Sequence, residues 1–203
     1  MQYANLEKLG ARPSRLGFGC MRFPTTPEGT IDEPRALAML DMAYQGGVNY
    51  FDTAYFYHQR TSEAFVGRAL KAYPRESFYL ATKLPMGIIT SLDQAKEIFE
   101  GQFASLQVSY FDFYLLHALN AEHWRNAVDQ GILAFLEEQQ RRGRIRHLGF
   151  SFHDSYDVFE RILTARPWDF CQIQFNYMDT QIQAGMKGYD LATRLGVPVF
   201  VME

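Results

Sequence analysis

The sequence has only two cysteines and no apolar run long enough to cross a bilayer. Cys20 and Cys171 lie far apart within apolar segments, so we expect two buried free thiols and a reducing compartment. No Cys-x-x-Cys pair or histidine-rich cluster indicates a metal site. Residues 1–5 lack the charged and apolar blocks of a signal peptide. Together these absences predict a cytoplasmic protein without a membrane segment.

A large excess of charge of one sign is absent as well. The net charge of -3 gives no reason to expect nucleic acid or an anionic membrane as a partner. Apolar residues make up 47% of the chain and aromatic residues 15%, which is enough material for a buried core. A length of 203 residues is typical of one domain. We therefore predict a single domain over residues 1–203.

Short apolar segments alternate with helical patterns along most of the chain. The expected strands lie at residues 16–21, 48–51, 78–82, 111–116, 147–150, 170–175 and 197–202. The expected helices lie at residues 32–45, 62–72, 92–106, 132–142, 156–165 and 188–195. The strand segments are nearly continuous apolar runs, which is typical of parallel strands covered by helices. Such alternation indicates a parallel sheet or a barrel.

Two observations favour a barrel over an open doubly wound sheet. No Gly-x-Gly-x-x-Gly lies between the first strand and its helix, where a Rossmann fold binds pyrophosphate. Candidate polar residues follow the second, third and fourth strands in succession, and a barrel gathers consecutive strand ends around one mouth. We predict a (β/α)8 TIM-barrel type fold with a β-hairpin over residues 2–15, truncated after the seventh strand. Its uncovered strand edges would allow self-association.

Four side chains at strand ends carry the chemistry. Asp52 and Tyr57 follow the second strand, Lys83 ends the third, and His117 ends the fourth. Gathered at one mouth, a phenol, an ammonium, a carboxylate and an imidazole form a proton-delivery device. A free tyrosine has a pKa of about 10, and a neighbouring buried ammonium lowers that pKa.

A resemblance to a known family rests on six segments taken in order. They are Leu16-Gly17-Phe18-Gly19, Phe51-Asp52-Thr53-Ala54-x-x-Tyr57, Ala81-Thr82-Lys83, Leu115-Leu116-His117, Gly143-Arg144-Ile145-Arg146-His147-Leu148-Gly149-Phe150-Ser151, and Gln172. With these segments the chain resembles the aldo-keto reductases, and is similar to bacterial members that carry an iron–sulfur tail beyond the barrel. The resemblance implies that Tyr57 is the general acid, supported by Lys83, Asp52 and His117. It also implies reduction of a small aldehyde or ketone by hydride transfer, which leaves negative charge on the carbonyl oxygen and so needs a proton donor. In the implied site Asp52 pairs with Lys83, and His117 orients the carbonyl oxygen.

The resemblance further implies a nicotinamide cofactor, NADPH or alternatively NADH. Ser151 and Gln172 match positions that hold its carboxamide, Asp52 lies beside it, and Met202 falls where relatives often place an aromatic ring. After Ser151 many relatives have Asn, whereas this chain has Phe152, and His153 is the expected substitute.

Other expectations concern the rim of the site and competing functions. The segments Leu84–Thr90 and Ala118–Gly131 are the expected substrate walls. Glu63 matches a recurrent position of the aldo-keto reductase family, and the alternative explanation is an acid in the first turn of a helix. His58 and His123 would border the site. Two alternatives remain: a catalytically inactive fragment, or a nucleotide-sensing interaction protein of the same fold.

Overall fold

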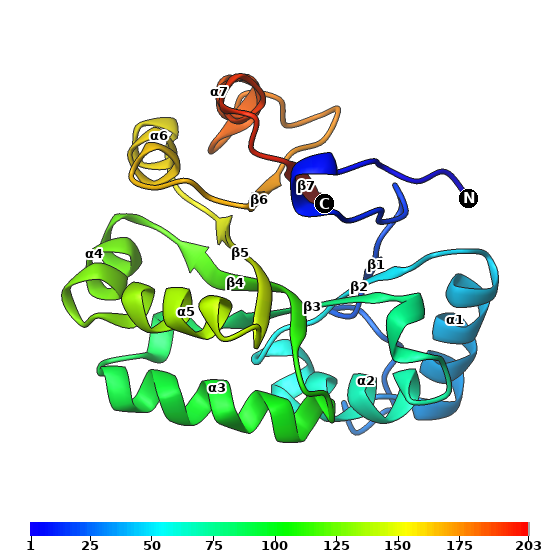
Figure 1. Cartoon of the computed structure of the whole chain (residues 1–203). Helices are drawn as coiled ribbons and strands as arrows, with labels where there is room; N and C mark the ends of the chain where they lie inside the picture. The colour runs from blue at the N-terminus through cyan, green and yellow to red at the C-terminus, as the bar shows by residue number, and fades with distance from the viewer. Residues whose placement is uncertain (203) are drawn as a thin grey trace. The chain divides into compact units, whose positions relative to one another are not determined.

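A computed structural model describes residues 1–202 (Figure 1). The chain divides into two compact units. The first unit comprises Met1–Leu84 and Lys96–Phe113. The second comprises Pro85–Ala95 and the chain from residue 114 onward. The two units are described separately below, and the prediction of a single domain stays a prediction.

Seven strands alternate with helices, as the sequence predicts. They are β1 (Phe18–Gly19), β2 (Tyr50–Asp52), β3 (Tyr79–Leu84), β4 (Phe111–Leu119), β5 (Ile145–Phe152), β6 (Phe170–Gln174) and β7 (Val199–Met202). The strand order of the sheet is that of the chain. In the first unit β1 pairs with β2 and β2 with β3, and in the second unit β5 pairs with β6 and β6 with β7, all in parallel. The predicted parallel arrangement is therefore confirmed.

Local sequence signals fix the helices α1 (Glu33–Gln45), α2 (Ser62–Leu70) and α3 (Leu92–Leu106). The Asp32 side chain caps α1 by accepting the Arg35 backbone N–H at 3.3 Å, and a proline lies in the first turn. The predicted hairpin is present in reduced form, as two antiparallel bridges, Tyr3↔Ser14 and Leu6↔Ala11, around a short 3-10 turn.

The second unit contains four helices, one more than the sequence patterns predict. They are α4 (Ala121–Asp129), α5 (Ile132–Arg141), α6 (Tyr156–Thr164) and α7 (Gly185–Leu195), with α4 beside α5 (Figure 1). No helix was expected within the predicted substrate wall Ala118–Gly131. Helix α4 was missed because it has only nine residues and buries a single one of them, Ala127. Its signal is the N-cap, since the Asn120 side chain accepts the His123 backbone N–H at 2.7 Å.

Two strand ends differ from the prediction in ways that affect the site. The strand expected at residues 16–21 is reduced to the two residues of β1. Strand β4 continues two residues beyond His117, which therefore lies within the strand and not at its end. The cysteines agree with the sequence reading, since Cys20 and Cys171 are free and buried. Burial raises the pKa of the Cys171 thiol to about 12.

Gly149 offers a direct test of the β5–β6 pairing in the second unit. A Cβ at Gly149 would lie 2.6 Å from both the Phe170 carbonyl oxygen and its ring. We expect Gly149→Ala to lower the free energy of unfolding by about 1–3 kcal/mol through overpacking, measured by urea denaturation. The matched control is Gly101→Ala in α3, where a Cβ meets nothing within 4 Å. That control should gain about 1 kcal/mol from helix propensity, and equal effects of the two substitutions would contradict the proposed packing.

Candidate functional site

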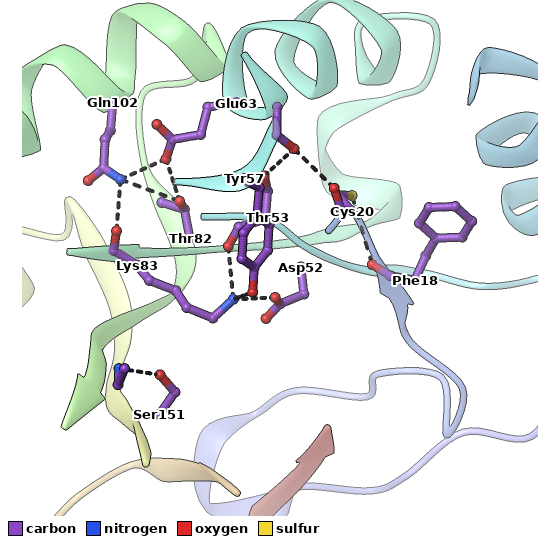
Figure 2. A network of polar contacts seen from close by, with 12 residues as sticks. Phe18, Cys20, Asp52, Thr53, Tyr57, Glu63, Thr82, Lys83, Gln102 and Ser151 are labelled. Atoms are coloured by element: carbon purple, nitrogen blue, oxygen red, sulfur yellow. Dashed lines mark hydrogen bonds and ion pairs between the residues drawn. The ribbon is translucent and has the colours of Figure 1, made fainter. Parts of the chain in front are cut away.

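Lys83 is the centre of a polar cluster in the first unit. Its side chain is 1% exposed, and its ammonium donates to the Asp52 carboxylate, to the Thr53 carbonyl oxygen at 3.0 Å and to the Tyr57 hydroxyl at 3.2 Å (Figure 2). The three donors of the ammonium are thus matched by three acceptors. The structure therefore brings together three of the four residues that the sequence singles out for catalysis.

Parallel strand pairing explains why Asp52 and Lys83 meet. Asp52 on β2 lies in register with Ala81 on β3, and the Thr53 backbone N–H donates to the Ala81 carbonyl at 2.9 Å. Lys83 is two residues beyond Ala81 and so points to the same face of the strand. Because the carboxyl ends of parallel strands share one edge, the carboxylate and the ammonium are placed together before any loop geometry is considered.

Tyr57 follows β2 on a strained turn that the sequence analysis missed. The next three residues, His58, Gln59 and Arg60, have φ values of 47°, 54° and 71°. The left-handed conformation costs a non-glycine residue about 1–2 kcal/mol, so surrounding contacts must hold the turn. The His58 Nε2 accepts the Phe23 backbone N–H at 3.1 Å, which ties the turn to a buried aromatic residue.

Burial and charge set opposing pKa shifts in this cluster. Burial lowers the pKa of Lys83, but Asp52 and Tyr57 together raise it by more. The net pKa therefore lies above the ordinary value, and the ammonium stays charged. Burial raises the pKa of Tyr57 and the Lys83 charge lowers it, with a net pKa above 10. Lys83 lowers the pKa of Tyr57, as predicted. The expectation of a Tyr57 pKa below the ordinary value was wrong, because burial raises this pKa by more than Lys83 lowers it.

Glu63 belongs to the same polar cluster. It lies in the first turn of α2, as predicted, but it is only 5% exposed. Its Oε1 accepts hydrogen bonds from Thr82 Oγ1 at 2.5 Å and Gln102 Nε2 at 2.6 Å (Figure 2). Burial raises the pKa of Glu63 to about 6, against the two hydrogen bonds, which lower it. The acid is therefore an internal group of the cluster and not a solvated helix terminus.

The second unit contains the residues expected to hold a cofactor, together with His117, which is half-buried in β4. Ser151 on β5 lies in register with Gln172 on β6, and both are buried. The Ala118 backbone N–H donates to Ser151 Oγ at 2.8 Å, so the hydroxyl hydrogen is available to another acceptor. A hydroxyl donor beside a primary amide has the chemistry that binds a carboxamide. Met202 on β7 is half-buried and in register with Gln174.

The two residues that follow Ser151 make contacts of their own. Phe152 is fully buried, and its ring lies 5.1 Å from that of Phe159. His153 is exposed, and its Nδ1 lies 3.1 Å from Gln183 Oε1. Phe152 is therefore a core residue, whereas His153 contacts the segment that precedes α7.

Comparison with known proteins decides the family. Residues 15–203 match the family model described as the aldo/keto reductase family. The chain belongs to this family. It is 27% identical over 191 residues to probable aldo-keto reductase 1 of Glycine max, covering 90% of the chain and 54% of that protein. It is 25% identical over 199 residues to aldo-keto reductase YhdN of Bacillus subtilis, covering 93% of the chain and 58% of that protein.

Solved structures of family members confirm the barrel-type fold. The holo form of aldo-keto reductase AKR11C1 from Bacillus halodurans aligns with a TM-score of 0.81 and 31% identity. That alignment covers 99% of this chain and 65% of that structure. The chain thus spans a little over half the length of these curated relatives and about two thirds of this solved one. Within residues 1–202, no helix is long and apolar enough to span a membrane.

The two predicted substrate walls, Leu84–Thr90 and Ala118–Gly131, border the same cavity in the second unit of this aldo/keto reductase. Its volume is about 370 Å³. It is lined by Met86–Thr90 and by residues of α4. The Asn126 side chain donates to the Ile89 carbonyl at 2.6 Å, which joins the two walls. The His123 Nδ1 lies 2.8 Å from the Ala118 carbonyl oxygen, which can only accept, so Nδ1 is the donor of this hydrogen bond.

The buried carboxyl group of Glu63 predicts a step in stability with pH. Because its folded-state pKa of about 6 lies above the ordinary value of 4.5, the folded protein holds this proton more tightly than the unfolded chain. The stabilising contribution is complete below pH 4.5 and is lost as the pH rises through 6, by about 2 kcal/mol. Urea denaturation of the native chain and of Glu63→Gln between pH 4 and 8 measures it. Parallel pH profiles for the two proteins would contradict the assignment.

Proposed function

We propose that this protein reduces a small aldehyde or ketone in the cytoplasm with NADPH, or alternatively NADH, and that Tyr57 is the general acid. The observation that carries the proposal is the buried Lys83 ammonium, which contacts both the Asp52 carboxylate and the Tyr57 hydroxyl. Membership of the aldo/keto reductase family supports the reaction class.

The geometry defines what Tyr57 does. Since Lys83 donates an N–H to the Tyr57 oxygen, the phenol hydrogen must point elsewhere, toward a substrate oxygen. The raised pKa keeps Tyr57 protonated at neutral pH, as a proton donor must be. When the proton leaves, the phenolate forms 3.2 Å from a fixed positive charge, which stabilises it without reorganisation. Asp52 keeps that charge in place.

The remaining roles follow from the second unit. Ser151 and Gln172 would hold the carboxamide of the cofactor, with Met202 as a further contact of this unit; Asp52, which belongs to the first unit, is the other residue assigned to the cofactor. The nicotinamide group supplies a hydride when it is bound. His117 would orient the substrate carbonyl, and the cavity between Met86–Thr90 and α4 would receive the rest of the substrate. Of the alternatives, an inactive fragment or a nucleotide-sensing protein has no chemical use for a buried Lys83–Tyr57 contact.

Tyr57→Phe tests the general acid directly. Removing the hydroxyl should lower kcat/KM for carbonyl reduction by at least about a hundredfold, the usual contribution of a positioned acid. Cofactor affinity, measured by nicotinamide fluorescence titration, should change by no more than a few-fold. Tyr55→Phe, two residues earlier in the same segment, is the matched control and should keep its activity. Retention of activity in Tyr57→Phe would remove the basis of the proposed mechanism.

The cavity in the second unit predicts a specificity change at Gly87. A Cβ at Gly87 would lie 3.7 Å from the His123 ring, which is an ordinary van der Waals distance. Gly87→Ala should therefore be neutral, whereas Gly87→Leu should fill part of the cavity. We expect the larger variant to raise KM for long carbonyl substrates and to leave kcat and KM for short ones unchanged. A uniform effect on both kinds of substrate would show that the cavity does not receive the substrate.

A further inference from the structure

Glu63 is a buried charged group that has no place in the mechanism above. Its two hydrogen-bond donors are Thr82 on β3 and Gln102 on α3, and neither is a proposed catalytic residue. Burying an ionisable carboxyl group costs stability. Glu63 lowers the stability of the first unit, and its hydrogen-bond partner Gln102 contacts Lys83. A destabilising residue in this place calls for a functional explanation.

Gln102 connects Glu63 to the Lys83 backbone. Its side chain is 1% exposed, and Nε2 donates to Glu63 Oε1 at 2.6 Å and to the Lys83 carbonyl oxygen at 3.0 Å. A longer contact of 3.4 Å reaches Thr82 Oγ1. Figure 2 shows this branch at the backbone end of Lys83, whereas Tyr57 and Asp52 lie at its ammonium end. The main chain of Lys83 is thus held by Gln102 while its ammonium is held by Asp52, Thr53 and Tyr57.

The direction of these hydrogen bonds depends on Glu63. An amide can present either oxygen or NH₂ to a neighbour, whereas an ionised carboxylate only accepts. Glu63 therefore requires the NH₂ group of Gln102 on its own side, and the Lys83 carbonyl, which also only accepts, lies within reach of the same group. Without Glu63, the amide could rotate and lose its hydrogen bond to Lys83.

We propose that Glu63 and Gln102 form a positioning pair that fixes the backbone of Lys83, and through it the distance from the ammonium to the Tyr57 hydroxyl. The proposal deepens the proposed function and rests on it for its kinetic consequence. Small displacements of catalytic groups are costly, since a shift of about 1 Å can lower the rate about a hundredfold. Burying Glu63 thus lowers the stability of the fold but keeps the Lys83–Tyr57 contact at a fixed distance.

Kinetics of five variants test the pair. Glu63→Leu and Gln102→Leu should each lower kcat about ten- to a hundredfold with cofactor affinity unchanged. The double variant should be no worse than either single one, because both break the same connection. Glu63→Gln keeps an acceptor oxygen and should recover most of kcat. Thr82→Val, the matched control, removes the other partner of Glu63 and should keep the native kcat. Additive losses in the double variant, or an equal loss in Thr82→Val, would overturn the proposal.

A measurement without turnover separates this proposal from the proposed function. The ¹³C chemical shift of the Lys83 carbonyl, observed by NMR through the Leu84 amide, reports its hydrogen bond to Gln102. We expect the same change in shift in Glu63→Leu and Gln102→Leu, and none in Thr82→Val. If the native protein reduces no carbonyl compound but these shifts change as expected, the proposed function fails and the positioning pair stands. If the shift is unchanged in Glu63→Leu, the pair is refuted whatever the activity.

Discussion

The contact between the buried Lys83 ammonium and the Asp52 carboxylate is the interaction on which the rest of the candidate site depends. An ammonium that is 1% exposed is tolerated only because acceptors surround it, and removing one partner of such a buried pair typically costs about 3–5 kcal/mol. Because β2 and β3 are parallel and in register, the pair forms at one edge of the sheet. The fold thereby provides a fixed positive charge beside Tyr57.

Several features around this charge oppose stability. Three successive residues after Tyr57 are left-handed without being glycine, and Glu63 is an acid buried next to β3. Tyr57 itself is shifted away from ionisation by burial. These features are concentrated within the first unit near the Lys83–Tyr57 contact. Such concentration is typical of sites where geometry is selected over stability.

The sequence predicts most of the fold because its signals are local. The bounds of α3 follow from apolar spacing and a polar first turn, and β4 to β6 from continuous apolar runs. The Asp52–Lys83 pair is also predictable, since strand ends in a parallel sheet meet. Helix α4 was missed because it is short and buries only Ala127, so its clearest sequence signal is the Asn120 cap.

The burial of Glu63 and the turn at His58 could not be read from the sequence, because both depend on residues distant along the chain. Glu63 is enclosed by Thr82 and Gln102, and His58 is held by Phe23. The net pKa of Tyr57 depends on how much water the folded chain removes, which no spacing rule reports.

The most direct test of the account is a titration of the Tyr57 phenol in the native protein and in Lys83→Met. Tyrosine labelled with ¹³C at Cζ, assigned with Tyr57→Phe, reports this pKa by NMR without cofactor or substrate. Because Lys83 lowers a pKa that burial raises, the account predicts a higher Tyr57 pKa in Lys83→Met than in the native protein. An unchanged Tyr57 pKa in folded Lys83→Met would contradict the coupling that the proposed mechanism requires.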